Sequence, residues 1–191
     1  MESTLLYFVH IPKTAGSTLR QIFAQNFEKH QRLGLPGPES TNNFILNDNR
    51  SAILSGSVRL ISGHGKYGAL RDYPIGVKHF TFLRDPWDRL ASQIRYIQKK
   101  GKITKPPKDD ESIYQLAKEE YLHHPTYTDN ILIRHVLGDL PNNHWVNEDD
   151  LSKAKEFLLN KFDSFYVTEY FDESVLMMAK RYRLTPPYIQ R

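Results

Sequence analysis

Short apolar runs alternate along the chain with segments in which apolar residues recur every three or four positions. The runs predict buried strands over residues 5–11, 58–64, 77–85 and 163–170. The helical spacing begins at Leu19 and is repeated in the segments 85–98, 110–122, 128–138, 147–162 and 171–182. Strands that alternate with helices predict an α/β domain with a mainly parallel central sheet flanked by helices.

One long stretch shows neither pattern. Residues 34–57 are polar and carry Gly34, Pro36, Gly37 and Pro38 near their start. This composition predicts a long loop or a flexible insertion. In a parallel sheet, ligands bind at the carboxyl ends of the strands, so the loops that follow the predicted strands are the candidates for chemistry.

The segment HIPKTAGSTL, residues 10–19, leads from the first strand through a polar loop into a helix. The first N–H groups of a helix are unpaired and carry partial positive charge, so such a turn favours an oxyanion, above all a phosphate. Gly16 permits close approach of the backbone, Lys13 adds a charge, and Thr14, Ser17 and Thr18 add hydroxyl groups. The alternative is an ordinary capped turn with Ser17 as N-cap and a solvated Lys13.

The nucleotide-binding P-loop G-x-x-x-x-G-K-[ST] does not fit this loop. Its lysine precedes the only glycine, and no glycine opens the turn. An ATP or GTP enzyme of the Walker type is therefore disfavoured.

A second oxyanion site is expected after the third strand, in the segment FLRDPWDRLASQIRY. Arg84 ends the strand, Asp85 is the expected N-cap of the next helix, and Ser92 follows in that helix. Arginine suits forked contact with a phosphate. The alternative is that Arg84 pairs with Asp85, Asp88 or another acid in a surface network.

The segment SGHGKYG after the second strand holds a candidate general base. His64 lies between two glycines beyond a strand end, so it is expected to be accessible, and its near-neutral pKa suits it to take a proton from a hydroxyl. Glu169, at the end of the fourth strand, is an alternative base, an adenosine-side contact, or a residue that caps or pairs. Tyr67, close to His64 in the sequence, is expected either to line the acceptor cleft or to pack against other side chains without a role in binding.

Composition narrows the class of protein. The 191 residues predict a single domain, 1–191, and the sequence has neither cysteine nor an apolar run of the ~18 residues that would suggest a membrane span. The short lead before the first strand leaves no room for a signal peptide, which favours a cytoplasmic protein, although an excised domain also begins in this way. The formal net charge of +4 suits an anionic ligand.

Nucleic acid and metal ions are not expected partners. The one dense basic run, 99–108, contains Gly101 and two prolines and predicts a loop rather than a basic face. The histidines at 123, 124, 135 and 144 lack metal-ligand spacing.

Together, HIPKTAGSTL, SGHGKYG, FTFLRDPWDRLASQIRY and the later YVTEYFDESVLMM resemble the carbohydrate-type sulfotransferases that use 3′-phosphoadenosine 5′-phosphosulfate (PAPS). The glycosaminoglycan 2-O-sulfotransferases and related bacterial enzymes are the nearest comparison. The resemblance spans residues 5 to about 180 and implies a P-loop-NTPase-like fold.

By position, the resemblance implies a role for each motif. The 5′-phosphosulfate would lie on the loop formed by Lys13, Thr14, Ala15, Gly16, Ser17 and Thr18. Arg84 and Ser92 would bind the 3′-phosphate, His64 would be the base, and Lys13 would stabilise the leaving phosphate. The product would be 3′-phosphoadenosine 5′-phosphate (PAP), the acceptor a hydroxyl on a carbohydrate, and no metal would be needed.

The sequence departs from this family at two places. Ser62 replaces the first histidine of the H-G-H segment of the 2-O-sulfotransferases, and the chain ends at RLTPPYIQR, where relatives continue. A C-terminally truncated domain could be a non-catalytic nucleotide-binding module of the same fold. A nucleotide kinase is a further alternative, disfavoured by the position of the lysine. The sequence leaves the oligomeric state open.

Overall fold

The computed structural model describes residues 4–37, 39–100, 109–121 and 130–186, with only the backbone described for 117–121. A 5-stranded parallel sheet lies at its centre, in the order β2-β3-β1-β4-β5. The strands are β1 (Leu5–Val9), β2 (Arg32–Leu35), β3 (Leu60–Gly63), β4 (Val77–Leu83) and β5 (Ser164–Val167). The predicted α/β class with a mainly parallel sheet is confirmed.

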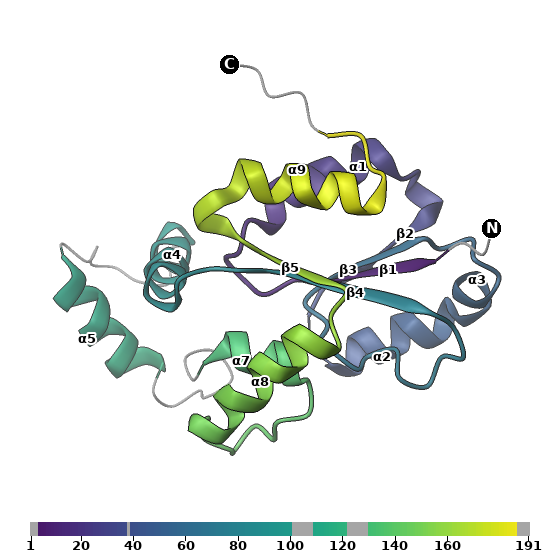
Figure 1. The fold of residues 1–191 in the computed structure, drawn as a ribbon. Helices are drawn as coiled ribbons and strands as arrows, with labels where there is room; N and C mark the ends of the chain where they lie inside the picture. The colour runs from purple at the N-terminus through teal and green to yellow at the C-terminus, as the bar shows by residue number, and fades with distance from the viewer. Residues whose placement is uncertain (1–3, 38, 101–108, 122–129, 187–191) are drawn as a thin grey trace.

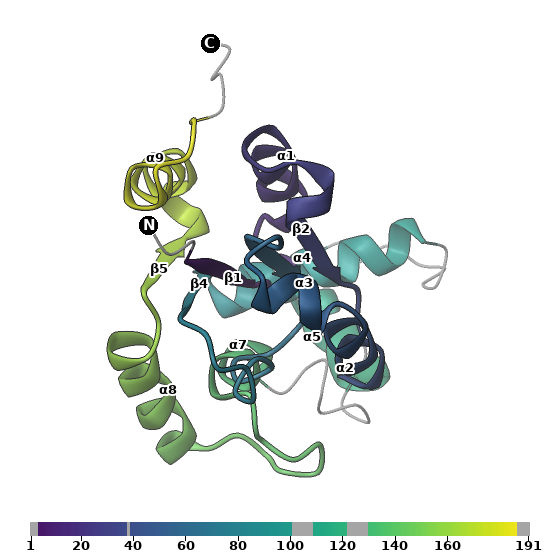
Figure 2. The ribbon, with the colours of Figure 1, turned by 90° about the vertical axis from the view of Figure 1, so that its right-hand side faces the viewer.

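Helices cover both faces of this sheet (Figures 1 and 2). One face carries α1 (Gly16–Asn26) and α9 (Phe171–Tyr182). The other carries α2 (Glu39–Asp48), α3 (Arg50–Leu54), α7 (Ile131–Leu137) and α8 (Glu148–Asn160). The remaining pair, α4 (Pro86–Lys99) and α5 (Asp110–Tyr121), lies beyond the carboxyl ends of the strands, at the left of Figure 1.

The central strand β1 contributes side chains to both layers of the core. All of its residues are buried, and successive side chains point to opposite faces. Leu5, Tyr7 and Val9 pack with α2, α3, α7 and α8, whereas Leu6 and Phe8 pack with α1 and α9. The loop that follows β1 therefore starts from a strand that is fixed on both sides.

Residues 34–57 are not the loop or insertion that their composition predicts. They contain the end of β2 and the helices α2 and α3, and Leu46 and Ile53 of these helices are fully buried. The Asn42 side chain donates to Gly37 O at 2.8 Å and fixes the turn into α2. The prediction failed because β2 has only four residues and α2 is rich in asparagine, a poor helix former.

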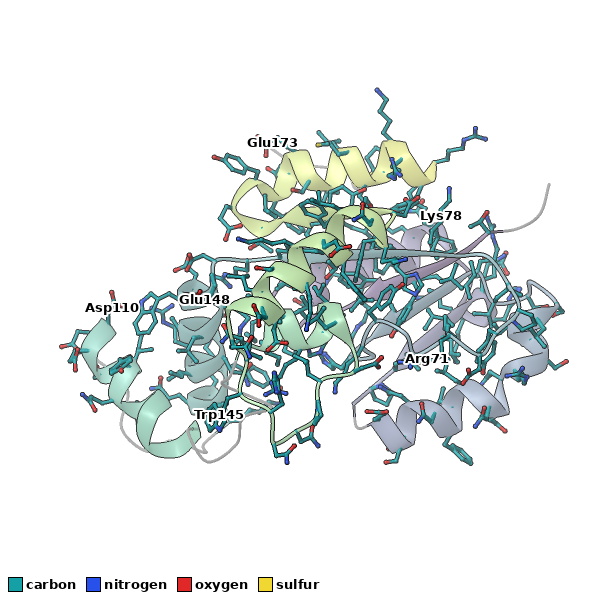
Figure 3. All side chains as sticks on the ribbon, turned by 60° about the horizontal axis from the view of Figure 1, so that its bottom comes forward. Arg71, Lys78, Asp110, Trp145, Glu148 and Glu173 are labelled. Atoms are coloured by element: carbon teal, nitrogen blue, oxygen red, sulfur yellow. The ribbon has the colours of Figure 1, made fainter. Side chains whose placement is uncertain are left out.

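The other predicted helices are present with shifts of a few residues. The predicted helix 128–138 is described from Ile131 onward, and residues 122–129, with His123 and His124, lie outside the described residues, as do residues 101–108 of the basic run. Figure 3 shows Glu173 on the outer side of α9 and Asp110 at the start of α5, both exposed. None of the described helices has the length and apolar character needed to cross a bilayer.

Candidate functional site

The strand order brings the three candidate motifs together. β1 lies between β3 and β4, and Val9 at its end is in register with Gly63 on one side and Thr81 on the other. The loops that follow these parallel strands therefore leave the same edge of the sheet next to one another, beside α4 (Figure 1). Lys13, His64 and Arg84 each come from one of these loops.

The loop between β1 and α1 has an unusual backbone. Lys13 (φ 72°) and Ala15 (φ 63°) are both left-handed, a conformation that costs non-glycine residues roughly 1–2 kcal/mol. Ala15 is the N-cap of α1 and no side chain caps this helix, so the alternative with Ser17 as N-cap is wrong. Among the described residues, the N–H groups of Lys13, Ala15, Gly16 and Ser17 have no protein acceptor. Such strained loops with free amides bind anions.

The hydroxyl groups of this loop divide into two kinds. Thr14 is fully buried, and its Oγ1 donates to Ile11 O at 2.8 Å, as its own N–H does at 3.3 Å. Its hydroxyl proton therefore stabilises the turn rather than facing a ligand. Ser17 and Thr18 are exposed at the start of α1, where their hydroxyl groups are open to solvent.

The Lys13 side chain crosses toward α4. Its Nζ lies 4.6 Å from the centre of the Tyr96 ring, and Lys100 Nζ lies 5.8 Å from the same ring. Partial burial, followed by the positive charges of Arg84 and Lys99, lowers the pKa of Lys13 below its usual value. Lys13 therefore lies in a region where positive charge is concentrated and where an anion would be stabilised.

Arg84 joins the two predicted anion sites. Its Nη1 donates to Lys13 O at 3.4 Å, and it forms no ion pair with a carboxylate among the described residues. Asp85 instead caps α4 by accepting from the N–H groups of Trp87 (2.9 Å) and Asp88 (3.0 Å). The expected alternative, an Arg84–acid network, is therefore absent from the part of the chain that the structure describes.

Two further predicted residues lie beside Arg84. Ser92 is half-buried in α4, and its hydroxyl forms no hydrogen bond with another described side chain or backbone group. Glu169 Oε1 accepts from Asp85 N at 2.7 Å, so this carboxylate braces the start of α4, as its capping alternative predicts. That contact makes Glu169 a poor candidate for the base.

His64 has a defined tautomer. Its Nδ1 lies 3.2 Å from His10 O, and because a carbonyl oxygen only accepts, Nδ1 carries the proton and the Nε2 lone pair is left free. Burial lowers the pKa of His64, more than the hydrogen bond to His10 raises it. A neutral imidazole with a free Nε2 is the form that a general base needs.

His64 is less accessible than its flanking glycines predict. It is half-buried and stacks on His10, with ring centres 4.5 Å apart and planes inclined by 26°. Gly63 is needed for packing, because its φ is 139° and a Cβ there would lie 2.1 Å from Leu35 O. The glycine therefore lets β3 pass close to β2 rather than exposing the histidine.

His10 is a site residue that the sequence reasoning missed. It is buried between His64 and the start of α1, and its Nε2 would lie 1.9 Å from a Cβ on Gly16. Burial, followed by the charge of His64, lowers the pKa of His10 to about 3, so the ring is neutral. Its position directly after β1, at the carboxyl edge where parallel sheets commonly bind ligands, was the available signal.

Arg89 is a second residue that was missed. Its side chain is 4% exposed, and its Nη1 is buried without a hydrogen-bond partner among the described residues. Arg89 lies in the first turns of α4, and its spacing of three residues from Ser92 on the same helix was the available signal.

The remaining candidates have structural roles. Tyr67 packs against His79, Phe157 and Phe162, with ring centres 4.8, 5.5 and 5.3 Å away, so it belongs to the core. His144 Nε2 lies 2.6 Å from Asp150 Oδ2 at the start of α8. No group of histidine and acidic side chains in the described residues could hold a metal ion.

Comparison with solved structures shows where this fold occurs. The mouse sulfotransferase SULT7A1, solved as a complex with PAP, aligns with a TM-score of 0.53 and 13% identity over 98% of this chain. Retinol dehydratase, solved with androsterone and inactive cofactor PAP, aligns with a TM-score of 0.36 and 14% identity over 95% of this chain and 65% of that chain. No protein-family profile matches the chain, and no curated protein matches its sequence.

The two chains compared at the higher score differ in length. This chain spans 61% of the length of the mouse sulfotransferase. At 13% identity the likeness concerns the fold, and it confirms the predicted P-loop-like α/β domain with a parallel sheet between helices. The chain therefore shares its fold with a sulfotransferase.

Proposed function

We propose that this chain is a PAPS-dependent sulfotransferase that transfers a sulfuryl group to a hydroxyl, on a carbohydrate acceptor. The observation that carries the proposal is the paired anion site at the sheet edge. The uncapped amides of the Lys13 loop and the Arg84 guanidinium adjoin each other, and no described carboxylate forms an ion pair with either cation. The shared fold with a sulfotransferase supports the same function.

In this proposal the donor spans both regions. Its 5′-phosphosulfate lies on the amides of residues 13 and 15–17 and on the Ser17 and Thr18 hydroxyls, at the start of α1. Its 3′-phosphate is held by Arg84 and Ser92. The hydrogen bond from Arg84 to Lys13 O fixes the position of one region relative to the other.

Sulfuryl transfer then needs one base and one stabilised leaving group. The acceptor oxygen forms a bond to sulfur as the bond from sulfur to the bridging phosphate oxygen breaks, and PAP leaves with that electron pair. His64 Nε2 takes the hydroxyl proton, while His64 Nδ1–H remains bound to His10 O. Lys13 stabilises the charge that develops on the leaving oxygen.

The carbohydrate acceptor rests on the resemblance of the motifs to the carbohydrate-type sulfotransferases. Ser62 stands where the 2-O-sulfotransferases have their first histidine, so the acceptor need not be theirs. A panel of uronic-acid, hexosamine and neutral-sugar hydroxyls, tested with radiolabelled PAPS, identifies the acceptor class.

Binding of PAP tests the donor assignment. PAP at about 100-fold above its dissociation constant should stabilise the fold by about 2.7 kcal/mol, as measured by thermal shift and calorimetry. Stabilisation by ATP and magnesium with no effect of PAP would contradict the proposal in favour of a kinase. Tight PAP binding with no turnover on any acceptor would favour the non-catalytic module.

The pH dependence of His64→Ala tests the base. Because burial lowers the pKa of His64 below its usual value, kcat/KM of the wild type should be flat through neutral pH and fall in acid as the imidazole is protonated. His64→Ala should lower turnover by roughly 10²–10⁴-fold and remove this acid limb. The exposed His30, which pairs with Glu28, provides the control: His30→Ala should leave both unchanged.

A further inference from the structure

A column of four stacked rings leads from the core to His64. The ring of Phe80 stacks on that of Phe8, with centres 5.2 Å apart and planes inclined by 24°. Phe8 stacks on His10 at 5.4 Å and 19°, and His10 stacks on His64 at 4.5 Å and 26°. Phe8 and Phe80 are fully buried beneath α1 and α9. The column is therefore anchored in the core, and His64 is its outermost ring.

His10 is the link between the core and His64, and it is held on several sides. Its N–H donates to Gly63 O at 3.0 Å, and its carbonyl oxygen lies 3.2 Å from His64 Nδ1. Its ring packs against the first residue of α1, because a Cβ on Gly16 would lie 1.9 Å from Nε2. One fixed residue therefore contacts both the Nδ1–H group and the ring face of His64.

The ring of His10 acts through its face rather than through its nitrogens. These nitrogens form no hydrogen bond with a described residue. Burial, followed by the charge of His64, lowers the pKa of His10 to about 3, so the ring is neutral. The face of a neutral aromatic ring attracts a cation. The stack should therefore strengthen when His64 becomes positively charged.

We propose that His10 is the positioning residue of the base. Its carbonyl oxygen and its ring fix the orientation of the His64 imidazole, and its ring face stabilises the imidazolium that forms when Nε2 takes the acceptor proton. This inference rests on the proposed function. His10 touches neither donor nor acceptor in it and acts only through His64.

The other titratable groups near His64 stay the same when His10 is replaced. Arg20 on α1 lowers the pKa of His64 through its charge. His135 on α7 also faces His64, but burial lowers the pKa of His135 to about 4, so this ring is neutral. Lys13 acts through its charge on His10. A change in the pKa of His64 therefore reports the loss of the ring at position 10.

The first test follows His64 directly by NMR titration of its ring nitrogens, in the protein without ligands. His10→Leu fills the site without a ring face, whereas His10→Phe keeps one. The stack favours the charged form of His64, so His10→Leu should lower the pKa of His64 by about 0.3–1.5 pH units. His10→Phe should cause no such fall, because a phenyl face also attracts a cation.

Kinetics with PAPS and the acceptor identified by the panel give the second readout. His10→Leu should lower kcat by roughly 2- to 30-fold and move the acid limb of kcat/KM to lower pH. PAP affinity should be nearly unchanged, because the backbone amides of the Lys13 loop remain. His10→Phe should keep most of kcat.

His79→Leu is the matched control for replacing a buried histidine. His79 lies on β4, with its ring centre 5.4 Å from that of Tyr7 and 4.8 Å from that of Tyr67. Its replacement should lower the unfolding temperature and leave the pKa of His64 and the acid limb in place. General destabilisation is thereby separated from an effect on the base.

Each outcome decides a separate question. If the wild type sulfates no acceptor, the proposed function fails, and the inference fails with it. If the wild type is active and His10→Leu lowers kcat without moving the pKa of His64, the ring is merely structural and the inference alone is overturned. An unchanged kcat and pKa in His10→Leu would also overturn it. If His10→Leu does not fold, His10→Asn, which also lacks a ring, is titrated in its place, and an unchanged pKa again overturns the inference.

Discussion

The starts of α1 and α4 lie at the same sheet edge but present opposite chemistry. α1 begins at a left-handed Ala15 with no side-chain cap and no acid in its first turn. α4 begins with Asp85, which accepts from two amides, and has Pro86 and Asp88 in its first turn. The first helix therefore offers free backbone donors, whereas the second has satisfied its own.

The difference shows two ways to hold a phosphate. In the β1–α1 loop the backbone carries the positive potential, and Lys13 adds the charge that chemistry requires. At α4 the helix end is closed, so recognition depends on the side chains of Arg84 and Ser92. Under the proposed function, the first region serves the breaking bond and the second serves a phosphate that does not react.

Lys13→Met gives the largest expected effect. It removes the charge at the leaving oxygen, so turnover should fall by roughly 10²–10³-fold while the preference for PAP over adenosine 5′-phosphate persists. Steady-state kinetics with PAPS and calorimetry measure the two effects. Lys100→Met is the matched control, since Lys100 faces the same Tyr96 ring. If Lys13→Met and Lys100→Met lost the same amount of turnover, Lys13 would act only by adding to the overall positive charge of this region.

Arg84→Met is expected to affect binding instead. Loss of a charge-assisted contact costs about 1.5–3 kcal/mol, so PAP should bind roughly 10- to 150-fold more weakly while adenosine 5′-phosphate is little affected. The exposed Arg95, which lies in α4 just after Arg84 in the chain, supplies the control variant, Arg95→Met. A variant that still discriminates the 3′-phosphate fully would place that phosphate elsewhere.

Asp85→Ala should change stability more than catalysis. It leaves the N–H groups of Trp87 and Asp88 without their cap, which should lower the free energy of unfolding by about 1 kcal/mol in chemical denaturation. Asp88→Ala, which removes an exposed charge but no cap, should cost less. A larger loss of PAP affinity than of stability would mean that Asp85 positions Arg84.

Ala15→Gly gives the smallest effect and tests the strained loop. Glycine adopts φ 63° without penalty, so the variant should be more stable by up to about 1 kcal/mol. Ala24→Gly, at an exposed position within α1, should have the opposite sign, with a loss of about 1 kcal/mol. If Ala15→Gly is destabilising, the left-handed backbone carries no strain.

The sequence determined the elements and the edge at which the site lies. Apolar spacing is a local property, so the alternation of strands and helices could be read directly. Parallel strands share one polarity, so the loops with Lys13, His64 and Arg84 had to leave the same edge. The structure of segment 34–57 was not predicted, because β2 pairs with β3 alone among the described strands and the helices α2 and α3 depend on buried Leu46 and Ile53 rather than on local preference.

Only the tertiary structure decided how the side chains at that edge are used. It turned the Thr14 hydroxyl inward, set Glu169 against Asp85 N, stacked His10 on His64 and buried Arg89. Most of these contacts join residues far apart in the chain, such as the 84 positions between Asp85 and Glu169. Local sequence patterns cannot predict such pairs, because strand order and the packing of separate layers around β1 determine which residues come into contact.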